Sequence, residues 1–279
     1  MYIEGNIYKI RLLSFMLMLV FATGCNNIGL NKHTDDSESL VTENQSDTAV
    51  PEYSGALKIW TAGDSITYEY RGYRCGIWEM MSAAGNELDF VGTQHFDLGP
   101  YSRNPDEDHD GYRGYNIKQW RAEFSDANNG KLQMMQAEDP DVLLLMLGTN
   151  NFGYQSQLVS DTPVETSVYQ MMRLVDQIFE WFDDIAVVVG TIPPMADATF
   201  PNTHTRAEYI TAYNALLMNT VKDHSLYHTK LFISDNYSAL TYPDDFQDQL
   251  HPNAAGHDKI AGEWMKAISA YLALPERKL

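Results

Sequence analysis

Residues 142–147 limit the fold more strongly than any other part of the sequence. The run Val-Leu-Leu-Leu-Met-Leu is apolar throughout and does not alternate with polar residues, and it is bounded by Pro140-Asp141 and Gly148. A short unbroken apolar run of this kind is typical of a strand buried on both faces of a parallel sheet. We therefore expect this strand at the centre of a sheet whose two faces are covered by helices.

Four further apolar runs predict strands, and amphipathic segments between them predict helices. The strands are expected at residues 58–62, 88–92, 185–189 and 231–234. The helices are expected at residues 77–84, 116–123, 131–138, 168–182, 210–221 and 260–272. Because strands alternate with helices, the connections should be right-handed βαβ units. The sequence thus predicts an α/β protein built as a three-layer α/β/α sandwich.

Residues 1–24 have the features of a signal peptide of the lipoprotein type. Lys9 and Arg11 precede an apolar run of about a dozen residues, which is short for a membrane span and typical of a signal peptide. The run ends at Ala22-Thr23-Gly24-Cys25, which resembles a bacterial lipoprotein processing site and predicts lipidation of Cys25. The alternative is an ordinary secretory peptide cut near Gly24, which would release the protein without an anchor.

Residues 25–54 are expected to form a disordered polar tether, because Asn, Asp, Ser, Thr and Glu are frequent there and apolar periodicity is absent. The folded domain is expected at residues 55–279. Export would place this domain at the bacterial cell surface or in the periplasm. We expect a monomer that contacts the membrane only through the lipid on Cys25.

The formal net charge of the chain is -19 at pH 7. A surface this acidic repels nucleic acid and anionic lipid headgroups and favours uncharged substrates. The chain has two cysteines, Cys25 and Cys75, and lipidation of the first leaves no disulfide framework. Cys75 is therefore expected to act as a small buried hydrophobic residue.

The expected strand at residues 58–62 runs directly into Gly63-Asp64-Ser65. Open α/β sheets build their sites at the carboxyl ends of strands, so Ser65 is a candidate nucleophile. Glycine, aspartate and serine are also ordinary turn residues, and Asp64 is expected to hold this turn. A catalytic role for Ser65 therefore requires a base, a group that orients the base, and donors for an oxyanion.

Asp248 and His251 lie in the loop before the last expected helix. A carboxylate three residues before a histidine can accept a hydrogen bond from one ring nitrogen while the other nitrogen faces a serine hydroxyl. The alternative is a surface histidine with no such role. Candidate oxyanion donors are the backbone N–H groups of Ser65 and Gly114 and the side-chain amide of Asn150. Two of these candidates have alternative roles. Gly114 can be an ordinary turn residue, and Asn150 can be a residue in the left-handed conformation or a helix cap.

Four blocks of the sequence resemble, in order, those of the SGNH (GDSL-type) hydrolases. They are Gly63-Asp64-Ser65-Ile66-Thr67, the glycine of Gly111-Tyr112-Arg113-Gly114, Gly148-Thr149-Asn150, and Asp248-x-x-His251-Pro252-Asn253. The resemblance implies a flavodoxin-like, five-stranded parallel sheet of order 2-1-3-4-5. It also implies a catalytic Ser65, His251 and Asp248, with Ser65, Gly114 and Asn150 as the oxyanion hole. Gly-x-Ser-x-Gly is absent from the chain, so the α/β-hydrolase elbow is not the alternative.

Within this superfamily the loop ending at Gly114 and the block at His251 most resemble carbohydrate esterase family 3, the acetyl xylan esterases. The resemblance implies removal of O-acetyl groups from plant cell-wall polysaccharide without a cofactor. Asp64, Tyr112, Arg113 and Asn151 are then expected to bind substrate. Two positions depart from the family pattern: Glu69 stands where a glycine is frequent, and Tyr112-Arg113 replaces small or histidine residues.

Two other functions are open at this point: a lipid or thioester hydrolase of the lysophospholipase kind, and a non-catalytic glycan-binding lipoprotein. No metal is expected. The acidic run at residues 106–110 has oxygen ligands suitable for Ca²⁺ but lacks the spacing of an EF-hand. His224 and His228 lack the glutamate between them that a zinc protease needs.

Overall fold

The computed structural model describes residues 50–51, 53–69, 72–95, 106–153, 163–200 and 204–275. All of them belong to one compact unit, residues 47–279. The expected signal peptide (1–24), Cys25 and most of the expected tether (25–54) lie outside the described residues, so those expectations stay predictions. Tyr53, in the last part of the expected tether, makes two hydrogen bonds to the folded part. The Tyr53 N–H donates to Asn86 Oδ1 at 2.8 Å and its hydroxyl donates to Asp141 Oδ1 at 2.8 Å.

Five parallel strands form the body of the sheet, in the spatial order β2-β1-β4-β5-β6. They are β1 (Ala56–Gly63), β2 (Glu87–Val91), β4 (Val142–Met146), β5 (Ala186–Gly190) and β6 (Leu231–Ser234). This is the expected order of the five predicted strands. All five residues of β4 are fully buried, as its unbroken apolar sequence predicted.

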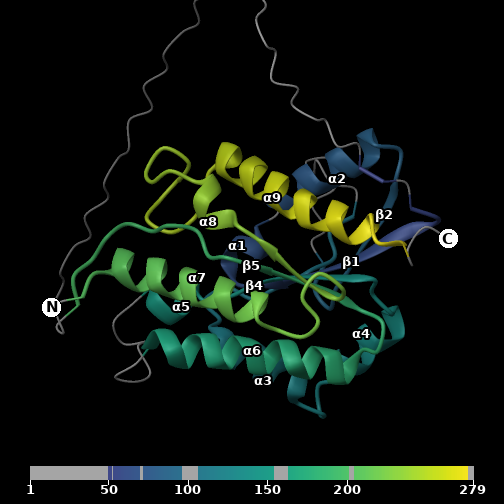
Figure 1. Cartoon of the computed structure of the whole chain (residues 1–279), viewed down its shortest axis with the longest axis horizontal. Coiled ribbons are helices and arrows are strands. Elements are labelled where there is room, and N and C mark those ends of the chain that lie inside the picture. Colours follow the sequence, from purple (N-terminus) through teal and green to yellow (C-terminus); the bar gives the residue numbers. More distant parts are fainter. Residues whose placement is uncertain are drawn as a thin grey trace, which may run out of the picture. The chain divides into compact units, whose positions relative to one another are not determined.

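Helices cover both faces of the sheet, which gives the predicted three layers (Figure 1). One layer holds α2 (Tyr73–Ala83) and α9 (Ala254–Leu272), and the other holds α3 (Ile117–Ser125), α6 (Pro163–Trp181) and α7 (Arg206–Lys222). The remaining helices are α1 (Ser65–Tyr68), α4 (Lys131–Glu138), α5 (Thr149–Phe152) and α8 (Asn236–Ala239). Among the described residues, no helix has the length and apolar character needed to cross a bilayer.

Side-chain caps fix where two of the long helices begin. The Thr205 side chain accepts from Glu208 N–H while the Glu208 side chain accepts from Thr205 N–H, which is a complete capping box at α7. At α9 the Asn253 side chain accepts a hydrogen bond from the N–H of Gly256. The cap at Asn253 also ends the loop that carries His251, so the start of α9 helps to place the candidate base.

The structure adds a two-residue strand, β3 (Asp110–Gly111), within the loop that the sequence analysis described as ending at Gly114. β3 pairs with Ala62 and Gly63 at the carboxyl end of β1, beyond the point where β2 stops at the Trp60–Val91 pair. Two residues are too short to show a strand periodicity, which is why the pattern does not reveal it. The pairing brings the segment after β3 alongside the end of β1.

Helix α4 offers a matched test of which face is buried, because Met135 is fully buried and its neighbour Met134 is 54% exposed. We expect Met135→Ala to lower the free energy of unfolding by about 2–5 kcal/mol, since it removes apolar contacts and leaves a cavity. Met134→Ala should change it by less than about 0.5 kcal/mol. Urea denaturation of the two variants measures both values. Equal effects would contradict this placement of α4.

Candidate active site

Ser65 lies at the point where β1 ends and α1 begins. The last position of β1 requires glycine. A Cβ on Gly63 would lie 2.8 Å from the carbonyl oxygen of Met146 and 2.1 Å from Oγ1 of Thr67, which is too close. Asp64 then caps α1, because its Oδ1 accepts a hydrogen bond from the N–H of Ile66 at 3.0 Å. The tight pairing and the cap together fix the turn that carries Ser65.

Ser65, His251 and Asp248 form one hydrogen-bonded chain. The Ser65 Oγ lies 2.9 Å from His251 Nε2, and His251 Nδ1 lies 2.8 Å from Asp248 Oδ2. The other Asp248 oxygen accepts the N–H groups of Leu250 at 2.7 Å and of His251 at 2.8 Å. The carboxylate therefore holds both the loop and the ring. Ser65 and His251, which are 186 positions apart in the chain, lie within hydrogen-bond distance.

Asp248 has a lowered pKa, which fixes the direction of these hydrogen bonds. Partial burial raises the pKa of Asp248, but the N–H groups of His251 and Leu250 and the His251 ring together lower it below its usual value. An ionised carboxylate can only accept, so Nδ1 of His251 is the donor to Asp248. In the neutral imidazole with its proton on Nδ1, Nε2 is the acceptor that faces the Ser65 hydroxyl. This is the arrangement in which a neutral imidazole can take a proton from a serine.

Asn150 reaches the turn formed by residues 112–115, which contains Gly114. Gly114 has a φ of +77°, which favours glycine, and the N–H of Tyr115 closes the turn by donating to the carbonyl of Tyr112 at 3.1 Å. Asn150 Nδ2 donates to the carbonyl of Tyr115 at 3.0 Å. The N–H of Tyr112 donates to the carbonyl of Gly63 at 2.9 Å, which ties the turn to the end of β1.

Tyr112 and Asp110 form a buried network that supports this turn. The Tyr112 hydroxyl donates to Asp110 Oδ1 at 3.1 Å and accepts from Lys131 Nζ at 2.9 Å. Asp110 also accepts from Trp60 Nε1 at 2.7 Å and from the Thr93 hydroxyl at 2.6 Å. Tyr112 is buried and its hydroxyl contacts Asp110 and Lys131, so these side chains support the turn; its expected contact with substrate stays a prediction.

Asp64 and Asn151, which were also expected to bind substrate, are buried as well. The Asp64 side chain is 0% exposed, and burial raises its pKa to about 6. Asn151 Oδ1 accepts from the N–H of Ile117 at 3.3 Å, and its Nδ2 donates to Ser167 Oγ at 3.1 Å. These contacts join α5 to α3 and α6. Of the four residues that were expected to bind substrate, Asp64, Tyr112 and Asn151 are buried and Arg113 is exposed. Their binding roles stay predictions.

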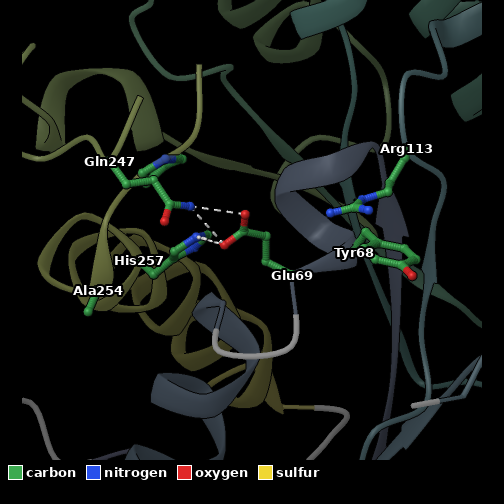
Figure 2. A pocket seen from close by; sticks show the side chains of 7 residues that line it. Tyr68, Glu69, Arg113, Gln247, Ala254 and His257 are labelled. Carbon is green, nitrogen blue, oxygen red and sulfur yellow. Dashed lines mark hydrogen bonds and ion pairs between the residues drawn. The ribbon is translucent and has the colours of Figure 1, made fainter. Parts of the chain in front are cut away.

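A cavity of about 360 Å³ is lined by Arg113 together with residues that the sequence had not marked as binding residues. Figure 2 shows Glu69 with Gln247 and His257 on one side of it, and Arg113 above Tyr68 on the other. The signal available in the sequence was that Glu69 replaces a frequent glycine. Nothing in the pattern indicated that His257 in α9 would reach the same cavity.

The remaining candidates lie outside this site. Cys75 is buried, as predicted. Within the described part of the chain, no group of three or more His, Cys, Asp or Glu side chains has the arrangement of a metal site. Asp106 of the acidic run instead accepts a hydrogen bond from the N–H of Phe90 in β2.

The chain belongs to the GDSL-like lipase/acylhydrolase family, whose profile matches residues 61–259. This match confirms the resemblance to SGNH hydrolases and spans every block on which it rested, from Gly63 to Asn253. The described domain is thus of the carboxylic ester hydrolase class.

Solved structures and a curated relative support the same assignment. A family 3 carbohydrate esterase from Clostridium thermocellum is 26% identical and has a TM-score of 0.60, and the alignment covers 79% of this chain and 100% of that one. A carbohydrate esterase family 3 protein from Talaromyces cellulolyticus is 25% identical with a TM-score of 0.58, over 75% and 95% of the two chains. A multidomain esterase of Ruminococcus flavefaciens is 29% identical over 235 residues. The match covers 78% of this chain and only 29% of that relative.

The buried carboxyl of Asp110 predicts a pH-dependent stability. Burial raises the pKa of Asp110 to about 6, from 3.8, so the native state holds this proton more tightly than the unfolded chain does. Ionisation of Asp110 therefore lowers stability as the pH rises from about 4 to about 6. Asp110→Asn removes this ionisation, so its stability relative to wild type should rise over that range by an amount on the order of 3 kcal/mol.

Urea denaturation of wild type and Asp110→Asn at a series of pH values measures this difference. Asp184→Asn is the matched control, because the Asp184 side chain is 93% exposed. A difference between Asp110→Asn and wild type that is independent of pH would contradict the raised pKa.

Proposed function

We propose that the domain is a serine esterase that removes O-acetyl groups from plant cell-wall polysaccharide, acetylated xylan or a related polymer. The observation that carries this proposal is the chain of hydrogen bonds from Asp248 through His251 to Ser65, at 2.8 and 2.9 Å. Such a chain at the carboxyl edge of a sheet is the arrangement that acyl transfer to a serine requires.

Ser65 Oγ attacks the carbonyl carbon of the acetyl ester while His251 Nε2 takes the hydroxyl proton. The ionised Asp248 stabilises the imidazolium that forms and keeps the ring oriented. The backbone N–H groups of Ser65 and Gly114 and the amide of Asn150 act as the oxyanion hole. Asn150 keeps a second N–H for this purpose after its bond to the carbonyl of Tyr115.

The tetrahedral intermediate then collapses and the bond from carbon to the sugar oxygen breaks. His251 gives its proton to that oxygen, so the sugar leaves as a free alcohol and the acetyl group stays on Ser65. A water molecule next attacks the acetyl carbon with His251 as its base. Acetate is released, and the proton returns to Ser65 Oγ through His251. No cofactor takes part in either half of this reaction.

Similarity to the two family 3 carbohydrate esterases supports a carbohydrate substrate. The cavity supports it as well, because Glu69, Arg113 and His257 line it. The complete Ser65, His251 and Asp248 chain argues against a binding protein without activity.

We also propose that residues 1–24 direct export and that Cys25 carries a lipid. The domain at residues 55–279 would then act as a monomer at the bacterial surface or in the periplasm, tethered by residues 25–54. An acidic protein at that location would meet uncharged polysaccharide without electrostatic repulsion.

Ser65→Ala is expected to lower the rate of acetate release from acetylated xylan by at least about a thousandfold, because no other group can form the acyl-enzyme. Asp248→Asn should cause a smaller loss, since it leaves His251 present but no longer charge-stabilised. Ser82→Ala, at an exposed serine of α2, is the matched control. A Ser65→Ala enzyme that keeps the wild-type rate would refute the proposal.

A further inference from the structure

The cavity lined by Glu69 and Arg113 is built from segments that also hold the reacting residues. Tyr68 and Glu69 closely follow Ser65 in the chain, Arg113 directly precedes Gly114, and Gln247 and Pro252 lie on either side of His251. A molecule bound in this cavity is therefore held by the three segments that also carry Ser65, Gly114 and His251.

The carboxylate of Glu69 is held in place by two side chains. Gln247 Nε2 donates to Oε1 at 3.1 Å and to Oε2 at 3.2 Å, and His257 Nε2 lies 3.5 Å from Oε2 (Figure 2). A carboxylate has about four acceptor sites, so Oε1 keeps acceptor capacity after these contacts. The Glu69 side chain is 27% exposed, which leaves it accessible from the cavity.

Glu69 is also ionised at neutral pH. Partial burial raises the pKa of Glu69, but His257, His251 and Gln247 together lower it below its usual value. The cavity therefore presents an oriented, charged hydrogen-bond acceptor. Sugar hydroxyls are the donors that such a group binds well, and hydrogen bonds to charged acceptors are stronger than neutral ones.

Arg113 supplies the opposite kind of group. Its guanidinium lies 4.7 Å from the centre of the Tyr68 ring, and it is exposed on the side of the cavity across from Glu69 in Figure 2. An acceptor on one wall and a donor on the other suit a ring that carries several hydroxyl and ether oxygens. A volume of about 360 Å³ lies within the range of small-molecule sites.

The proposed reaction places the leaving alcohol beside this cavity. His251 Nε2 must reach the sugar oxygen to protonate it, so the sugar ring lies on the His251 side of the scissile bond. Gln247, Pro252 and His257 belong to the loop and helix that flank His251, and all three line the cavity. The sugar that loses the acetyl group is thus the part of the substrate that can enter it.

We propose that Glu69 accepts a hydrogen bond from a free hydroxyl on the sugar that carries the acetyl group, and so selects partly acetylated sugars. This inference rests on the proposed esterase function and adds a substrate-selecting residue to it. Glu69 binds the leaving sugar and takes no part in the bond-breaking steps.

Glu69 has a second way to affect the rate, because its charge also acts on His251. An effect through His251 would change the hydrolysis of every acetyl ester alike. A hydrogen bond to the sugar would change only esters whose alcohol offers that hydroxyl. The two roles are therefore separated by comparing substrates with and without the hydroxyl.

The test uses two monoacetylated methyl xylosides, one with a free hydroxyl next to the ester and one with that hydroxyl replaced by hydrogen. For the wild type, kcat/KM should be about tenfold to a hundredfold higher for the first substrate, the size expected of a hydrogen bond to a charged group. Glu69→Ala should bring the ratio close to one. Glu69→Gln, which keeps an acceptor oxygen without the charge, should give an intermediate ratio.

Glu87→Gln is the matched control, since Glu87 is exposed at the amino end of β2, away from the edge that holds Ser65. It should keep the wild-type ratio. Thermal melting of each variant and the rate on 4-nitrophenyl acetate report whether the fold and the Ser65 chemistry survive. If Glu69→Ala does not fold, the test compares the kcat/KM ratio of Glu69→Gln with that of the wild type, and a lower ratio in Glu69→Gln supports the inference.

An unchanged ratio in folded Glu69→Ala, or a wild-type ratio near one, would overturn the inference. Equal losses on both xylosides would also overturn it and assign Glu69 to support of His251. These outcomes leave the proposed function intact as long as Ser65→Ala abolishes hydrolysis. Hydrolysis by Ser65→Ala at the wild-type rate would instead reject the proposed function itself.

Discussion

Gly63 pairs with Met146 of β4 on one side and with Gly111 of β3 on the other, at the carboxyl end of β1. This double pairing decides where Ser65 stands, because the chain turns out of the sheet directly after it. The parallel arrangement of the strands then brings the segments that follow β3 and β4 to the same edge. These segments are the turn that contains Gly114, after β3, and the helix that contains Asn150, after β4. The Ser65 contact with His251 needs one further feature, the loop that Asn253 ends by capping α9.

Carboxyl groups act in two different ways around this edge. Asp64 and Asp110 are buried, and their pKa values are raised to about 6 because burial disfavours the charged form. They hold the turns of Ser65 and Tyr112 through hydrogen bonds. Asp248 and Glu69 have lowered pKa values because N–H groups and imidazole rings face them. They are the two groups that face the proposed reaction, one through His251 and one through the sugar.

Much of this architecture could be predicted from the sequence because it rests on patterns that repeat. The unbroken run at residues 142–147 identified the central strand, and the helix periods predicted α6, α7 and α9. The blocks at Ser65, Gly114, Asn150 and His251 supplied the candidate residues of the site. Features that depend on one or two residues could not be predicted: β3 is too short to show a period, and the burial of Tyr112 depends on Asp110 and Lys131 reaching it through space. Glu69 and His257 are far apart in sequence, and only the packing of α9 brings them together.

The central claim is that His251 activates Ser65. Reaction with diisopropyl fluorophosphate, followed by peptide mass spectrometry, tests it directly, because this reagent traps a serine whose proton is taken by a neighbouring base. The account predicts one equivalent of label on the peptide that contains Ser65, and a large loss of labelling rate in His251→Ala. Label on a different residue, or an unchanged rate in a folded His251→Ala protein, would contradict it.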